Sequence, residues 1–121
     1  MTIYRSPLPD IRLRDQSITE RLFEGLGDEP ARVVLIDGPT GAEMTVAGLK
    51  DRIRRLAAGL AARGIGPGAV VAVFAPNCPD FAAAFHAVAY AGATVTTLNP
   101  SYTAHEVQHQ LADSGARLVI A

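Results

Sequence analysis

The sequence has one cysteine, Cys78, no tryptophan, and a net charge of only −1. A single cysteine cannot form an internal disulfide, which excludes the disulfide-stapled scaffolds of small secreted proteins and favours a cytoplasmic location. With 11 basic against 12 acidic residues, no basic surplus is left for binding nucleic acid or an anionic membrane surface. No run is long enough to cross a membrane, because the most apolar window, residues 81–95, falls short of roughly 20 residues.

What is present is typical of a globular protein: 121 residues, of which 49% are hydrophobic and 19% charged. The first segment, residues 1–16, carries charges and prolines where a signal peptide needs an apolar run. We therefore expect an extended N-terminal arm over 1–16 and a folded part over 17–121.

Start and stop signals of helices recur along the folded part. Ser17 and Thr103 each open a capping box, because a glutamate follows three residues later. Asn77 is expected to cap a third helix, and Gly64 to end a fourth in the left-handed conformation. The expected elements are helices over about 18–26, 46–64, 78–91 and 104–114, a hairpin over 31–46, and strands over 69–75, 93–98 and 117–121.

Residues 69–75 are a continuous apolar run without alternation, the pattern of a parallel strand buried on both faces. We expect 93–98 and 117–121 to be buried strands of the same kind. Strands that alternate with helices at this spacing predict right-handed crossovers, and so an α/β fold with a parallel βαβαβ unit. The last expected strand runs to Ala121, and nothing after it covers the sheet. We therefore expect residues 17–121 to be part of a larger domain.

The stretch HEVQH, residues 105–109, matches the zinc-peptidase pattern H-E-x-x-H, which places two imidazoles one helical turn apart. Glu106, however, sits three residues after Thr103, where it completes the capping box. A catalytic zinc also needs a third protein ligand, and no histidine or glutamate follows His109. We reject the peptidase and expect a solvated or partly packed helix face, with a weak adventitious metal site as the alternative.

The remaining candidate sites have structural interpretations. The glycines of residues 64–68 follow a helix and precede a strand, whereas a dinucleotide-binding fingerprint follows a strand and opens a helix. The glycine-containing stretch 38–41 lacks the lysine of a phosphate-binding loop. Both stretches are expected to be turns. Cys78 and His86 lie more than two helical turns apart, so we expect an inert thiol and a satisfied core or interface histidine.

The opening IYRSPLPDIRL (3–13) resembles the arm that begins the 4-coumarate–CoA ligases, and residues 44–81 resemble the first core motif of the wider family of adenylate-forming enzymes. Residues 89–121 resemble the second core motif: a small-residue run, an N-P-x-Y-T turn, and then E-x-x-x-Q. The likeness covers nearly the whole chain, in the family's order.

The resemblance implies a ligase that joins a carboxylic acid to coenzyme A through an acyl-adenylate, with ATP and Mg²⁺, of the 4-coumarate or fatty-acid type. The family's nucleotide-binding loop and catalytic lysines have no counterpart in these residues, so this chain alone is expected to be inactive. The rest of the ligase, or another protein, would cover the open sheet. The alternative is a non-enzymatic remnant or interaction module that docks on a partner chain.

The resemblance points to one turn for ligand contact. In some relatives the turn corresponding to Pro100, Ser101 and Tyr102 lies near the coenzyme A channel, and these three residues are the candidate rim. An ordinary strand-to-helix turn is the competing interpretation. No catalytic residue and no metal ligand is expected within the chain.

Overall fold

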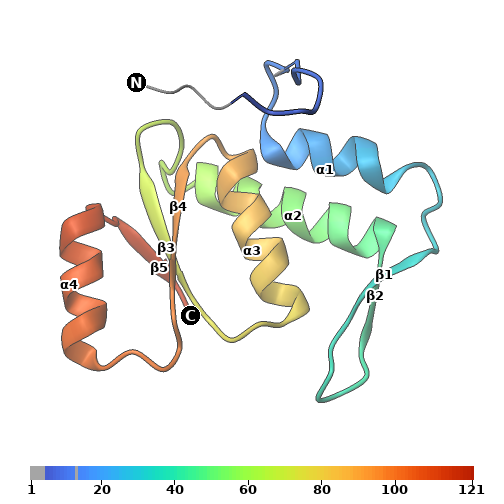
Figure 1. Ribbon diagram of the computed structural model, residues 1–121. Helices are drawn as coiled ribbons and strands as arrows, with labels where there is room; N and C mark the ends of the chain where they lie inside the picture. The colour runs from blue at the N-terminus through green and yellow to red at the C-terminus, as the bar shows by residue number, and fades with distance from the viewer. Residues whose placement is uncertain (1–4, 13) are drawn as a thin grey trace.

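The computed structural model describes residues 5–12 and 14–121 and contains two sheets and four helices among them. Figure 1 shows the main sheet between α4 on one face and the α1–α3 layer on the other, with the β1–β2 hairpin beside that layer. The elements are α1 (Ile18–Leu26), β1 (Val33–Ile36), β2 (Glu43–Thr45), α2 (Val46–Ala61), β3 (Val70–Phe74), α3 (Pro79–Tyr90), β4 (Thr94–Leu98), α4 (Ala104–Ser114) and β5 (Leu118–Ile120).

The main sheet has the strand order β4-β3-β5, and both neighbours run parallel to β3. The expected parallel α/β unit is thereby confirmed. The expected hairpin is confirmed as well, because β1 and β2 pair antiparallel in a separate two-stranded sheet. Since β4 and β5 lie on opposite sides of β3, the two crossover helices α3 and α4 lie on opposite faces of the sheet (Figure 1).

Only the central strand has the expected burial on both faces. Val71, Ala72 and Val73 of β3 are fully buried. The expectation of the same burial for β4 and β5 is wrong: Leu98 is the one buried residue of β4, and none of β5 is buried. The reason is position, because within the described residues both strands lie at an edge of the sheet.

The core lies between the sheet, α2 and α3. Ile53 of α2 and Val88 of α3 are fully buried, and the fully buried alanines Ala83 and Ala87 leave room for α2 to pack closely against α3. The expected apolar stripe of α2 is wrong at one place. Leu56 remains 38% exposed while Ala57, one residue on, takes the buried position.

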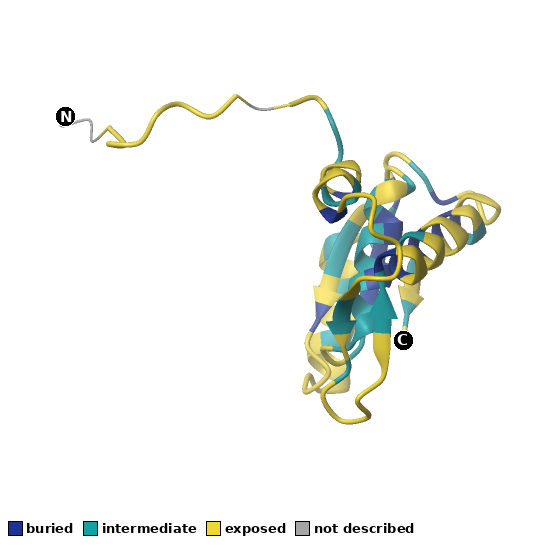
Figure 2. Ribbon diagram, turned by 90° about the vertical axis from the view of Figure 1, so that its right-hand side faces the viewer, coloured by how far each residue is buried: buried dark blue, intermediate teal, exposed yellow. Residues whose placement is uncertain are grey.

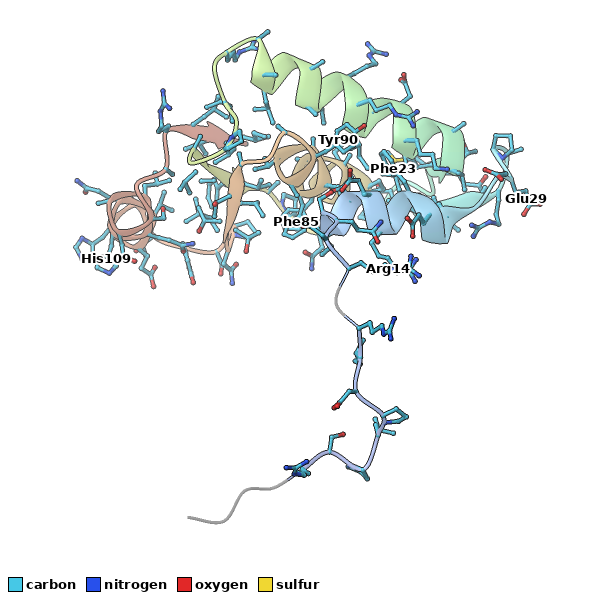
Figure 3. All side chains as sticks on the ribbon, turned by 90° about the horizontal axis from the view of Figure 1, so that it is seen from above. Arg14, Phe23, Glu29, Phe85, Tyr90 and His109 are labelled. Carbon is cyan, nitrogen blue, oxygen red and sulfur yellow. The ribbon has the colours of Figure 1, made fainter. Side chains whose placement is uncertain are left out.

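Helix α1 docks on α3 through an aromatic contact. The rings of Phe23 and Tyr90 lie 5.5 Å apart, and the guanidinium of Arg54 on α2 lies 5.1 Å from the Phe23 ring centre (Figure 3). Aromatic and cation–π contacts of this kind add to the burial of the rings themselves. Three helices are therefore joined at Phe23.

The described part of the arm, residues 5–12 and 14–16, forms no helix or strand, and residues 5–12 run away from the body (Figure 2). Residues 1–4 and 13 of the predicted arm lie outside the described residues. The division of the chain at residues 16 and 17 stays a prediction. Among the described helices, none combines the length and the apolar character needed to span a membrane.

Candidate functional site

The carboxyl ends of β3 and β4 form a topological switch point. Phe74, the last residue of β3, pairs with Leu98, the last residue of β4. From there the chain leaves β3 toward α3 on one face of the sheet and leaves β4 toward α4 on the other (Figure 1). In open parallel sheets, ligands bind in the crevice that such diverging connections create.

One side of this crevice is the turn from Asn99 to Tyr102, which a single side chain organises. The Asn99 Oδ1 atom accepts hydrogen bonds from the Ser101 amide at 3.0 Å and from the Ser101 hydroxyl at 2.8 Å. The Tyr102 amide also donates to the Asn99 carbonyl at 3.0 Å. Pro100, Ser101 and Tyr102 are all exposed, so the sequence-predicted rim residues are available to a ligand.

Helix α4 begins directly after this turn with the expected capping box. The Glu106 carboxylate accepts from the Thr103 amide at 2.8 Å and from its hydroxyl at 2.7 Å, and the Thr103 hydroxyl accepts from the Glu106 amide. The hydrogen bond from the Thr103 backbone, followed by that from its hydroxyl, lowers the pKa of Glu106. The charged carboxylate therefore has a structural partner, as the capping interpretation of HEVQH predicted.

The two histidines of HEVQH lie on the solvent side of α4. His105 and His109 are exposed, and Figure 3 shows His109 pointing away from the body. Within residues 5–12 and 14–121, no three His, Cys, Asp or Glu side chains are close enough together to hold a metal ion. We assign no metal ligand to this stretch.

The surface carries two open grooves, one of which includes Phe74 at the carboxyl end of β3. A mainly apolar one of about 720 Å³ lies beside α4, and a charged one of about 970 Å³ lies between the hairpin, α2 and the start of α3. In the charged groove Arg52 and Asp80 form an ion pair that ties α2 to the first turn of α3. The apolar groove is lined by Phe74, Tyr102, Ala104, Val107, Gln108, Leu111 and Ala112.

The cap of α3 differs from the expected one. Cys78, not Asn77, is the N-cap residue, and its side chain makes no capping hydrogen bond. Pro79 follows at the first helical position, where its fixed backbone angle suits a helix start without help from a polar cap. The thiol is half-buried, and no partner for it is found among the described residues.

His86, expected to be a satisfied histidine, is one. The buried Thr19 hydroxyl donates to the His86 carbonyl oxygen at 2.9 Å and lies 3.1 Å from His86 Nδ1. Burial lowers the pKa of His86, since the charged imidazolium loses hydration. The pair joins α1 to α3 and lies away from both grooves, whose lining residues do not include it.

Comparison with known proteins identifies the family. Residues 22–121 match the family model described as AMP-binding enzyme. The chain belongs to the AMP-binding enzyme family. The resemblance read from the sequence motifs is therefore confirmed, and the core motifs lie on the strands and helices that border the crevice.

Members of the AMP-binding enzyme family with high similarity are 4-coumarate–CoA ligases. The chain is 44% identical to 4-coumarate–CoA ligase 3 of Oryza sativa subsp. japonica and 42% identical to 4-coumarate–CoA ligase 4 of Arabidopsis thaliana. The matches cover 99% and 98% of this chain and 22% of each relative. The chain thus spans about a fifth of the length of these relatives.

Solved structures of the AMP-binding enzyme family share the fold. The luciferase-like enzyme of the mealworm Zophobas morio is 30% identical with a TM-score of 0.79, over 87% of this chain and 25% of its own. The O-succinylbenzoate coenzyme A synthetase of Bacillus subtilis, solved in complex with AMP, is 27% identical with a TM-score of 0.72, over 86% and 26%. The α/β fold is therefore that of the N-terminal part of adenylate-forming enzymes.

Sequence reasoning placed the turn but missed the groove beside it. Phe74 was expected within a strand buried on both faces, and Val107 and Leu111 were not singled out from the sequence. The sequence signal that could have found it is the spacing of Val107 and Leu111, one helical turn apart. In the structure α4 buries none of its residues, and these two side chains line the apolar groove.

Proposed function

We propose that this chain is the N-terminal part of an ATP-dependent, AMP-forming carboxylic acid–CoA ligase. The observation that carries the proposal is the 44% identity to a 4-coumarate–CoA ligase along 99% of the chain. In the proposed reaction, the acid's carboxylate attacks the α-phosphorus of ATP and releases pyrophosphate. The coenzyme A sulfur then forms the thioester bond, AMP leaves, and the thiol proton passes to a base or to solvent.

The part of the site that this chain supplies is the rim for coenzyme A. Ser101 and Tyr102 would hold the coenzyme at the crevice, because both are exposed and carry hydroxyl groups that can hydrogen bond to phosphate or ribose oxygens. Bound there, coenzyme A supplies the thiol that takes the acyl group. Magnesium and ATP have no ligands that we can assign within the described residues.

The substrate class follows from the relatives. We propose a hydroxycinnamate, because relatives 44% and 42% identical are named for 4-coumarate, or a fatty acid, the second class that the resemblance of the sequence motifs implies. A cytoplasmic location fits a chain with one free cysteine. The chain by itself is proposed to be inactive.

The test assays the complete protein that contains this chain. With 4-coumarate, ATP, Mg²⁺ and coenzyme A, we expect AMP, pyrophosphate and thioester in equal amounts, and acid-dependent pyrophosphate exchange without coenzyme A. Parallel assays with a fatty acid distinguish the two substrate classes. Release of ADP, or no acid-dependent pyrophosphate release with either acid, would overturn the proposal. The 121-residue chain serves as control and should show no exchange.

The second candidate function is a non-catalytic module that docks on a partner chain. The half-exposed edge strand β5, with Val119 44% exposed, favours it because unpaired apolar edges attract further strands. Sedimentation of the 121-residue chain over a range of concentrations tests this candidate. A cooperatively folded monomer at high concentration would count against it.

A further inference from the structure

The side chain of Asn99 holds the rim turn through its oxygen alone. One of its two partners is the Ser101 backbone amide, which can only donate, so the atom that faces it must be the carbonyl oxygen Oδ1. The Ser101 hydroxyl donates to the same oxygen. The structure shows no partner for the Asn99 amide nitrogen among the described residues. The turn therefore needs a hydrogen-bond acceptor at position 99.

Gln110 anchors the end of β4, just before the turn, with the opposite chemistry. Its Nε2 group lies 2.9 Å from the Thr97 carbonyl oxygen and 2.9 Å from Thr96 Oγ1. A backbone carbonyl can only accept, so the group that faces it must be the amide NH₂. Position 110 therefore needs a hydrogen-bond donor.

The anchor matters because α4 has little else to hold it. None of its residues is buried. The Thr94 amide donates a hydrogen bond to the Ala69 carbonyl, so the backbone groups of Thr94 face β3. Because the backbone groups of successive strand residues face opposite sides, the Thr97 carbonyl, three residues further along, points away from β3. Gln110 satisfies this edge carbonyl and holds α4 on β4 just before the turn begins.

We infer that Asn99 and Gln110 are positioning residues that set the orientation of Ser101 and Tyr102 toward coenzyme A, one by accepting and the other by donating hydrogen bonds. The inference rests on the proposed ligase function. Neither residue is required to touch the reacting atoms. The two side chains make a testable pair, because an amide-to-acid exchange preserves the oxygen that Asn99 uses and removes the NH₂ that Gln110 uses.

The experiment compares N99A, N99D and Q110E in the complete ligase. N99A and Q110E should raise KM for coenzyme A about five- to tenfold, the effect of one or two lost hydrogen bonds. N99D should stay near wild type, because the carboxylate keeps an acceptor in place. Acid-dependent pyrophosphate exchange, which needs no coenzyme A, should be unchanged in all three. An N99D enzyme as impaired as N99A, or an unchanged KM in N99A, would overturn the inference.

A second readout separates failure of the inference from failure of the proposed function. In the 121-residue chain, NMR measures exchange of the Ser101 amide proton with water, which should accelerate in N99A and not in N99D. If the wild-type ligase shows no acid-dependent exchange, the proposed function fails. If Ser101 exchange in N99A equals wild type, the positioning role of Asn99 fails whatever the enzyme does. Should Q110E not fold, as circular dichroism would show, the N99A and N99D pair still decides.

Discussion

Replacing Thr19 by valine probes the contact that joins α1 to α3. Thr19 is fully buried, and its hydroxyl proton is donated to the His86 carbonyl oxygen at 2.9 Å. His86 Nδ1 lies 3.1 Å from the same hydroxyl oxygen, and in the tautomer with a proton on Nδ1 the ring donates to it. Valine has the same shape and the same stiffness at χ1, so the change removes both hydrogen bonds without leaving a large cavity.

The expected loss of unfolding free energy is about 2 kcal/mol, because each net hydrogen bond contributes roughly 0.5–1.5 kcal/mol and the ring nitrogen left behind is only partly exposed. The serine variant keeps the hydroxyl and loses one buried methyl, which costs about 1 kcal/mol. Valine should therefore destabilise the chain more than serine does, although valine is the closer match in volume.

Urea denaturation followed by circular dichroism measures both variants. With a slope of about 2 kcal/mol per molar urea, the Thr19→Val midpoint should fall by about 1 M, and the Thr19→Ser midpoint by about half as much. A Thr19→Val midpoint equal to wild type, or one above that of Thr19→Ser, would refute the reasoning. It would mean that the buried hydroxyl contributes no more than a methyl group.

Three further perturbations have expected outcomes. Burial lowers the pKa of His86 below its ordinary value, so as the pH falls below about 6.5 the unfolded chain binds the proton first. Unfolding free energy should therefore decrease from about pH 7 to about pH 5.5, and this slope should shrink in His86→Gln; an identical slope would contradict the assignment. Thr103→Ala removes the α4 cap and should cost about 1 kcal/mol by urea denaturation; a stability equal to wild type would show that the cap contributes nothing. Gly92→Ala should lower the unfolding free energy more than its control Gly115→Ala does. Both glycines have positive φ, but only the new Cβ at position 92 would meet a Pro67 carbon, at 3.2 Å. Equal losses of unfolding free energy would show that the proline ring moves aside.

Local chemistry made the helix boundaries predictable. Ser17 and Thr103 open capping boxes as expected, and Gly64 and Gly115 have the positive φ of helix ends. These signals involve residues only three or four positions apart. For that reason the predicted helix over 18–26 matches α1 residue for residue.

Predictions that depended on distant neighbours were less accurate. Leu56 was expected in the core but is exposed, because the neighbouring elements cover Ala57 instead. β4 was expected to be buried on both faces but lies at an edge. A helical stripe or an apolar run shows which residues prefer burial, and it does not show which neighbour will provide it.

The sequence by itself determined the types and order of the elements, the caps of α1 and α4, the family, and the turn of Pro100, Ser101 and Tyr102. Only the tertiary structure decided that β3 lies between β4 and β5, which sends α3 and α4 to opposite faces and opens a crevice where β3 and β4 end. It alone showed that Gln110 reaches the edge of β4. The physical reason is range: caps and turns depend on hydrogen bonds between near neighbours, whereas strand order depends on burial and pairing between segments far apart in the chain.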